Sequence, residues 1–195
     1  MSQGDTARNN FSSARLELIE RIKLRDNVVV IFLGAIGVIF SISLRISENK
    51  DILYIIPYLS FGCSLIISQH NSVIGCLARY LVFELEPFLH SINEYAPQWD
   101  NSTSLKQYLS KAIQYRSISH VVLIVLPSIF ALMLLLEDSL DGSIIQKSLW
   151  VIGLVLVAIC VDFIIRSHTD RKDFQNEMNE KEEKNDIIIN NEKKN

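Results

Sequence analysis

Long apolar runs alternate with charged segments along the chain. The runs extend from Val28 to Ile46, from Ile52 to about Ser68, from about Ile118 to Leu136 and from Leu149 to about Ile165. None has a polar face at the helical period, which a helix of a water-soluble bundle would need. As helices they approach the roughly 20 residues that cross a bilayer. The pattern therefore predicts an all-α polytopic membrane protein with four transmembrane helices and helical extensions outside them.

The charged segments divide the chain further. We expect an N-terminal amphipathic helix, a transmembrane hairpin, a helical loop, a second transmembrane hairpin and a charged tail, over residues 1–27, 28–69, 70–116, 117–166 and 167–195. In the N-terminal helix, Leu16, Ile19 and Lys23 lie near one side, so this helix is predicted to lie along the membrane surface or to pack on a neighbour.

The helical loop and the tail carry patterns of their own. The loop begins with apolar residues at helical spacing, which predicts a helix that continues from the second run. Pro87 breaks or restarts this helix, because a proline fits the first turn of a new helix. Glu–Lys pairs four residues apart predict that the tail starts as a helix. The later apolar triplet 187–189 suits a docking motif or disorder, and disorder is favoured.

The distribution of basic residues predicts the orientation. Lys and Arg concentrate in the N-terminal segment, in the loop over 70–116 and at the start of the tail, and they are scarce after the first and third runs. Basic loops stay on the cytoplasmic side of a membrane. Both termini and the loop are therefore predicted to be cytoplasmic.

Composition excludes several classes of protein. The net charge of −3 lacks the basic excess of a nucleic-acid binder, so no direct binding of nucleic acid is expected. Three cysteines without CxxC spacing indicate neither a disulfide framework nor a zinc site. The chain has no nucleophile elbow and no glycine-rich phosphate loop. We therefore expect no enzymatic activity, no cofactor and no metal.

One set of residues has the spacing of a metal site. Glu86, His90 and Glu94 stand at i, i+4 and i+8, a spacing at which one helical face presents metal ligands. A solvated face is the favoured interpretation, because hydrolytic zinc sites usually carry two histidines around a glutamate.

Small and polar residues form two stripes in the first hairpin. Gly34, Gly37 and Ser41 share a face of the first run, and Ser60, Ser64 and Ser68 share a face of the second. Helices in a bilayer associate through small residues, so the two faces are predicted to pack together. The alternative is that the serines line a polar pore. Packing is favoured because a serine hydroxyl can bond a carbonyl of its own helix.

Asp162 is the acidic residue set within the fourth run. It can pair with Arg166 one turn later, as an interfacial ion pair. The functional alternative is a proton or cation site, or a residue by which protomers recognise one another. The sequence is equally consistent with an ion pair and with a functional role for Asp162.

The loop resembles a pattern in small four-span bacterial inner-membrane proteins. The matching residues lie within 65–100: His70, Asn71, Ile74, Tyr80, Glu86, Pro87, Trp99 and Asp100. The overall layout is also similar to the membrane subunit of the Kiwa anti-phage defence system, in architecture alone. These resemblances imply a homo-oligomer in the bacterial inner (plasma) membrane that works with a cytoplasmic partner protein.

Three functions follow as hypotheses. The leading one is a non-enzymatic, oligomeric inner-membrane protein that anchors a cytoplasmic partner in anti-phage defence or stress signalling. Its candidate partner-binding residues are Tyr80, Glu86, Pro87 and Trp99. The second is a small ion channel or membrane-permeabilising effector, suggested by Asp162 and the serine face. The third is an immunity-type regulatory subunit.

Overall fold

The computed structural model describes residues 3–45, 47–92 and 103–192. Its elements are the α-helices α1, α2, α3, α4, α5 and α6, the 3₁₀-helix η1 and the π-helix η2. In chain order they are α1 (Gln3–Arg45), η1 (Ser47–Tyr54), α2 (Ile55–Arg79), η2 (Tyr80–Leu85), α3 (Glu86–Ser91), α4 (Thr103–Leu134), α5 (Leu136–Asp141) and α6 (Ile144–Glu192). The predicted all-α fold is confirmed for the described part of the chain.

Three helical stretches are long and apolar enough to cross a membrane. They lie in α1, in the stretch Asn49–Ser91 that contains α2, and in α6 over Ile144–Ser167. α4 adds a shorter apolar stretch, Ile118–Leu134. Large apolar side chains point outward from these helices, as at Ile31 (71% exposed) and Met133 (68% exposed). This is the surface expected of a membrane-associated protein, whose outer face meets lipid.

The helices continue beyond the apolar runs without a break. α1 extends unbroken from Gln3 to Arg45, so its N-terminal part continues the first run directly. This N-terminal part of α1 packs against η2 and α3, which is one of the two predicted arrangements. The disorder expected around residues 187–189 is wrong for the backbone, because α6 continues as a helix to Glu192.

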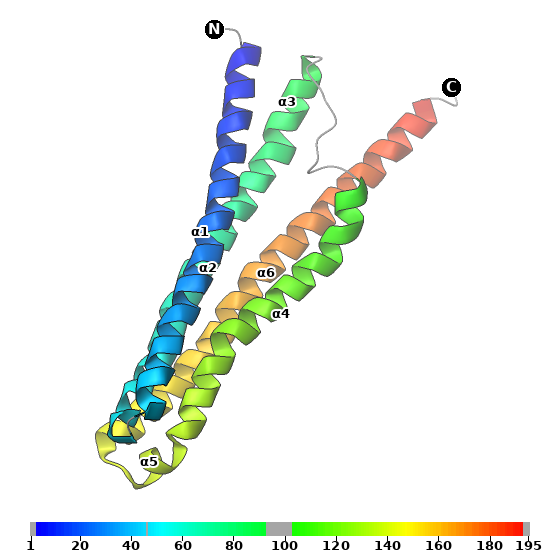
Figure 1. Cartoon of the computed structure of the whole chain (residues 1–195). Coiled ribbons are helices and arrows are strands. Elements are labelled where there is room, and N and C mark those ends of the chain that lie inside the picture. Colours follow the sequence, from blue (N-terminus) through cyan, green and yellow to red (C-terminus); the bar gives the residue numbers. More distant parts are fainter. Residues whose placement is uncertain (1–2, 46, 93–102, 193–195) are drawn as a thin grey trace.

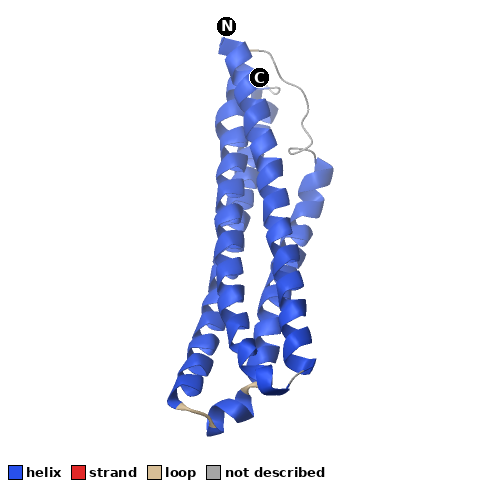
Figure 2. Ribbon diagram, turned by 60° about the vertical axis from the view of Figure 1, so that its left-hand side comes forward, coloured by secondary structure: helices blue, strands red, loops and turns tan. Residues whose placement is uncertain are grey.

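α2 is the central helix of the bundle. It packs against α1, α4 and α6, and α4 also packs against α6. Figure 1 shows an elongated bundle with α5 and the short connections at one end and both termini at the other. Figure 2 shows the same long helices side by side after rotation. The core lies along α2, where Ile56 and Ile67 are fully buried together with Ile124 of α4 and Ile164 of α6.

The long helix that contains α2 passes Pro87 by widening one turn. Proline has no N–H to donate to the preceding turn, and its ring crowds the carbonyl four residues back. In η2 the helix is π-helical, and the N–H of Glu86 donates to the carbonyl of Leu81, five residues earlier. Pro87 then lies in the first turn of α3, as predicted. The helix therefore restarts at the proline without changing direction.

Gly153 lies where α6 comes close to two neighbouring helices. A Cβ atom at this position would lie 3.0 Å from Cδ2 of Leu132 in α4 and 3.3 Å from Cγ of Pro57 in α2. Near Gly153, the indole Nε1 of Trp150 donates to the carbonyl of Leu132 at 2.9 Å. This is the close contact that small residues permit between helices in a bilayer.

We predict that Gly153→Leu destabilises the bundle by about 1–3 kcal/mol, because the added side chain meets α2 and α4. Gly62→Leu is the matched control on α2, where a Cβ has nothing within 4 Å. Thermal unfolding of the full chain in detergent micelles measures the difference. Equal unfolding temperatures for the two variants would contradict the close contact at Gly153.

Candidate functional site

Three of the four predicted partner-binding residues lie on a helical hairpin at the end of the bundle that carries the termini. This N-terminal hairpin consists of residues 3–24 of α1 packed against residues 77–91 of the α2–η2–α3 helix. Ala14, Leu81 and Leu85 form its buried cluster, with Phe11, Leu18, Leu77 and Tyr80 packed around it. Figure 1 shows α1 and α3 side by side there.

The predicted partner-binding residues differ in how far they are exposed on this hairpin. Tyr80 is half-buried and packs against the cluster of Ala14, Leu81 and Leu85, so it supports the hairpin. Glu86 is half-buried, whereas Pro87 is exposed and its neighbour Phe88 is 37% exposed. Trp99 lies outside the described residues. The surface available to a partner is therefore the α3 turn that contains Pro87 and Phe88.

A buried arginine lies at the base of this hairpin. Arg25 of α1 is only 2% exposed. Its Nε and Nη2 donate to Asp26 Oδ1 at 3.0 and 2.7 Å, and its Nη1 donates to Asn71 Oδ1 at 3.2 Å. A buried guanidinium needs such acceptors, because an unpaired buried charge is costly.

Asn71 connects the arginine to a third helix. It is fully buried on α2, and its Nδ2 donates to Ser167 Oγ of α6 at 3.3 Å. Ser167 in turn donates to the carbonyl of Ile164 at 2.9 Å. Arg25, Asn71 and Ser167 thus form a polar network, here called the Arg25 network, that ties α1, α2 and α6 together at one level.

His70 adds a buried nitrogen next to the Arg25 network. Its Nδ1, beside Asn71, is buried without a hydrogen-bond partner among the described atoms. Buried polar atoms without partners are uncommon in folded proteins. His70 and Asn71 are also the first two residues of the loop pattern noted in the sequence. Two residues of this pattern have structural roles. Asn71 belongs to the Arg25 network, and Ile74 is fully buried in the packing of α2.

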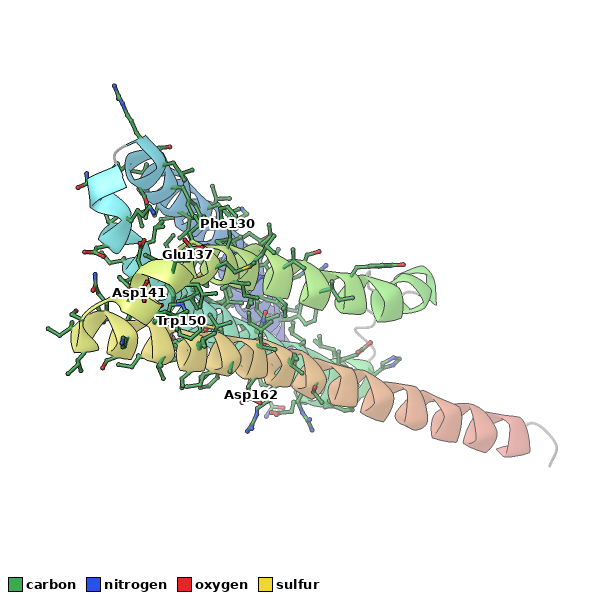
Figure 3. The ribbon with its side chains drawn as sticks, turned by 90° about the horizontal axis from the view of Figure 1, so that it is seen from below. Phe130, Glu137, Asp141, Trp150 and Asp162 are labelled. Carbon is green, nitrogen blue, oxygen red and sulfur yellow. The ribbon has the colours of Figure 1, made fainter. Side chains whose placement is uncertain are left out.

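Asp162 and Arg166 form the ion pair that one interpretation predicted. Arg166 Nε donates to Asp162 Oδ1 at 2.8 Å, and their side chains are 76% and 53% exposed, respectively. Figure 3 shows Asp162 on the side of α6 away from α4. The contact of Ser68 Oγ with the carbonyl of Phe163 places Asp162 level with the end of the apolar run in α2. This location favours an ion pair at the edge of the apolar region over a buried proton or cation site.

The predicted pairing of the two small-residue faces is wrong. Ser60 and Ser64 are buried, but Ser60 contacts α4, where its Oγ donates to the carbonyl of Ile124 at 3.0 Å and lies 2.6 Å from Ser128 Oγ. Ser68 reaches α6. Gly34, Gly37 and Ser41 are exposed, and a Cβ at either glycine would meet nothing within 4 Å. α1 uses a different face against α2, with Val29, Phe32 and Ile36 buried.

A metal site finds no support in the side chains that the structure describes. They contain no group of three His, Cys, Asp or Glu residues that could hold a metal ion. Glu94, the third residue of the Glu86–His90–Glu94 face, lies outside the described residues. The three cysteines are free thiols, with Cys63 and Cys160 buried and Cys76 exposed.

The sequence contains one signal for the burial of Arg25. Val29, Phe32 and Ile36 of α1 are buried at helical spacing, and one step of four residues back from Val29 is Arg25. An arginine in line with a buried face is expected to point into the bundle. Its acceptor, Asn71, could not be named from the sequence because it is 46 residues away.

Comparison with known proteins finds no relative: no protein-family model, no curated protein and no solved structure matches the chain.

We predict that Asn71→Leu lowers stability by about 2 kcal/mol, because Arg25 Nη1 loses its buried acceptor. The double variant Arg25→Met/Asn71→Leu should recover most of this loss, since an apolar pair replaces both partners. Asp162→Asn is the control and should cost less than about 1 kcal/mol, because its ion pair is exposed. Thermal unfolding in micelles provides the measurement. A double variant no more stable than Asn71→Leu would refute the pairing.

Proposed function

We propose that the chain is a four-span protein of the bacterial inner (plasma) membrane, with both termini in the cytoplasm. α4 supplies the fourth span: Ile118–Leu134 covers about 25 Å as a helix, close to the roughly 30 Å of a hydrocarbon core. Both termini lie at the same end of the bundle, which suits an even number of crossings. The concentration of Lys and Arg at that end favours the cytoplasmic side.

Within this membrane protein, the proposed function is to anchor a cytoplasmic partner protein, without enzymatic activity, in anti-phage defence or stress signalling. The observation that carries the proposal is the N-terminal hairpin. Residues 3–24 of α1 extend roughly 33 Å past the apolar run and pack through a cluster of their own against the α2–η2–α3 helix. A packed element of this length outside the bilayer is suited to presenting a surface to a protein.

The Arg25 network supports this role for the N-terminal hairpin. It holds α1 to α2 at the end of the apolar run, so the hairpin projects at a defined angle. Preorganised surfaces bind with a smaller loss of conformational entropy than mobile ones. The proposed contact surface is the exposed turn at Pro87 and Phe88, with Glu86 beside it and Trp99 as a further candidate.

The channel and the immunity-subunit hypotheses have no observation that favours them. Ser60 and Ser64, which a polar pore would use, are buried between helices, and their hydroxyls donate to the carbonyls of Ile124 and Phe61. Asp162 faces outward and pairs with Arg166. We therefore propose the anchoring function alone.

Topology can be tested with the native Cys76, which is exposed, whereas Cys63 and Cys160 are buried. A membrane-impermeant maleimide should label Cys76 in inverted vesicles and not in right-side-out vesicles. Lys50→Cys in a Cys76→Ser background should label with the opposite preference, because Lys50 is exposed at the other end of the bundle. The same labelling preference for both positions would contradict the four-span topology.

Partner binding can be tested by photo-crosslinking in living cells. A photoreactive residue at Phe88 should capture one discrete cytoplasmic protein, while the same residue at Lys50, at the opposite end, should not. Glu86→Lys should reduce the capture at Phe88 several-fold, because it reverses the charge beside the contact surface. Membrane insertion, measured by carbonate extraction, should not change.

Two results would refute the anchoring function. One is the absence of any discrete cross-linked protein at Phe88. The other is capture of the same proteins at Phe88 and Lys50.

A further inference from the structure

The end of the bundle opposite the termini is closed by α5 and the first turn of α6. This segment covers residues 136–147, and we call it the α5–α6 turn. Figure 3 looks onto this end of the bundle, with Glu137 and Asp141 on α5. The proposed topology places the α5–α6 turn on the outer side of the membrane.

The α5–α6 turn lies past the apolar part of the bundle. The indole Nε1 of Trp150 donates to the carbonyl of Leu132, so Trp150 is level with the last residues of the apolar stretch in α4. Ile144 precedes Trp150 by six residues, which is about 9 Å along the helix axis. The start of α6 therefore extends beyond the end of the apolar stretch in α4.

Polar contacts hold the α5–α6 turn in place. Gln146 Nε2 donates to Asp51 Oδ1 of η1 at 3.3 Å. Lys50 Nζ, also in η1, lies 3.4 Å from Asp138 Oδ2 of α5. Ser143 and Gln146 cap the start of α6: the N–H of Ser143 donates to Gln146 Oε1 at 2.9 Å, and the N–H of Gln146 donates to Ser143 Oγ at 3.4 Å. The turn is thus a preformed surface at a polar level of the bundle.

Large apolar side chains of the α5–α6 turn are exposed at this polar level. Leu140 is 65% exposed, Ile144 84% and Ile145 71%. A single exposed apolar residue is ordinary on a protein surface, but these three belong to one short segment, residues 140–145. Their exposure beside charged groups indicates a surface that a partner covers.

The charge of the turn indicates the chemistry of that partner. Residues 136–146 contain three acidic residues and no Lys or Arg. Glu137 and Asp141 are exposed one helical turn apart on α5, and neither forms an ion pair with another residue that the structure describes. Exposed apolar side chains next to unpaired carboxylates are complementary to a segment that is both basic and amphipathic.

We propose that the α5–α6 turn is the docking surface for a basic amphipathic peptide segment on the outer side of the membrane. The Lys or Arg side chains of this segment pair with Glu137 and Asp141, and its apolar face covers Leu140, Ile144 and Ile145. The proposal rests on the four-span topology for the side of the membrane. It goes beyond the anchoring function, whose surface lies at the opposite end of the bundle.

Two other occupants fit the charge of the turn less well. Helices that lie on a lipid surface carry Lys and Arg on their polar face, because these residues are attracted to anionic headgroups. The α5–α6 turn carries carboxylates instead. A second copy of the chain would bring the same carboxylates to the contact, where like charges repel one another.

Photo-crosslinking at Ile144 distinguishes the three occupants. The full chain, with a photoreactive residue at Ile144, is placed in nanodiscs of zwitterionic lipid, which leave both ends of the bundle accessible. The probe is a synthetic helical peptide of Leu and Lys with all its lysines on one face. It should be captured at Ile144 and not at Leu16, which is 68% exposed at the opposite end. Capture of lipid or of a second copy in place of the peptide, or equal peptide capture at Leu16, would overturn the proposal.

Fluorescence anisotropy of the labelled peptide measures the contribution of the carboxylates. Glu137→Lys/Asp141→Lys should weaken binding about tenfold, because two attractive contacts become repulsive. The matched control is Glu17→Lys/Glu20→Lys, which changes the net charge equally at exposed positions of the opposite end and should leave the affinity unchanged. Equal affinities of the two double variants would refute the docking surface.

A second variant and a second peptide test the apolar contact. Ile144→Ser/Ile145→Ser should weaken binding several-fold, because it removes apolar surface that the peptide covers. A peptide of the same composition with Leu and Lys in scrambled order should bind about tenfold more weakly, since it has no apolar face. If the serine variant and the scrambled peptide both bind as tightly as the unchanged pair, the proposal is wrong.

The outcome is separable from that of the anchoring function. Peptide binding at the α5–α6 turn without capture of a cytoplasmic protein at Phe88 refutes only the anchoring function. Capture at Phe88 without peptide binding refutes only the docking surface proposed here.

Discussion

The burial of Arg25 is the constraint on which the arrangement of the long helices depends. Its guanidinium is removed from water at the point where α1 passes from its charged to its apolar part, and Asn71 and Asp26 supply the acceptors. A charge in this position tolerates little displacement, because each lost hydrogen bond leaves a buried N–H without an acceptor. The register of α1 against α2 is therefore set by polar geometry at this level.

Hydropathy and charge were sufficient to predict the all-helical architecture, since the long apolar runs leave few alternatives. They did not identify the contacts between the runs. Gly34 and Gly37 were expected to pack within the chain, but they are open, whereas Gly153 lies close to two neighbouring helices. A row of small residues shows that a helix face suits close approach, but it does not identify the helix that approaches.

The apolar residues of the α2–η2–α3 helix are not buried at the positions that regular α-helical spacing predicts. Leu81, Leu85 and Leu89 are buried, whereas Phe88, which continues the regular α-helical spacing from Leu81, is 37% exposed. The π-helical turn before Pro87 takes up one extra residue, so the buried positions move from 88 to 89. The candidate residue Pro87 and its exposed neighbour thus owe their position to a backbone feature that periodicity alone does not predict.

The unbroken length of α1 has a mechanical consequence. With no kink between Gln3 and Arg45, the helix behaves as a stiff rod held near its middle at Arg25. The distance from Arg25 to the tip at Gln3 is about 33 Å, so a tilt of about 10° about that point moves the tip by about 6 Å. The opposite arm, along the apolar run, swings the other way. A pull on the tip is therefore transmitted to the apolar arm without any change in secondary structure.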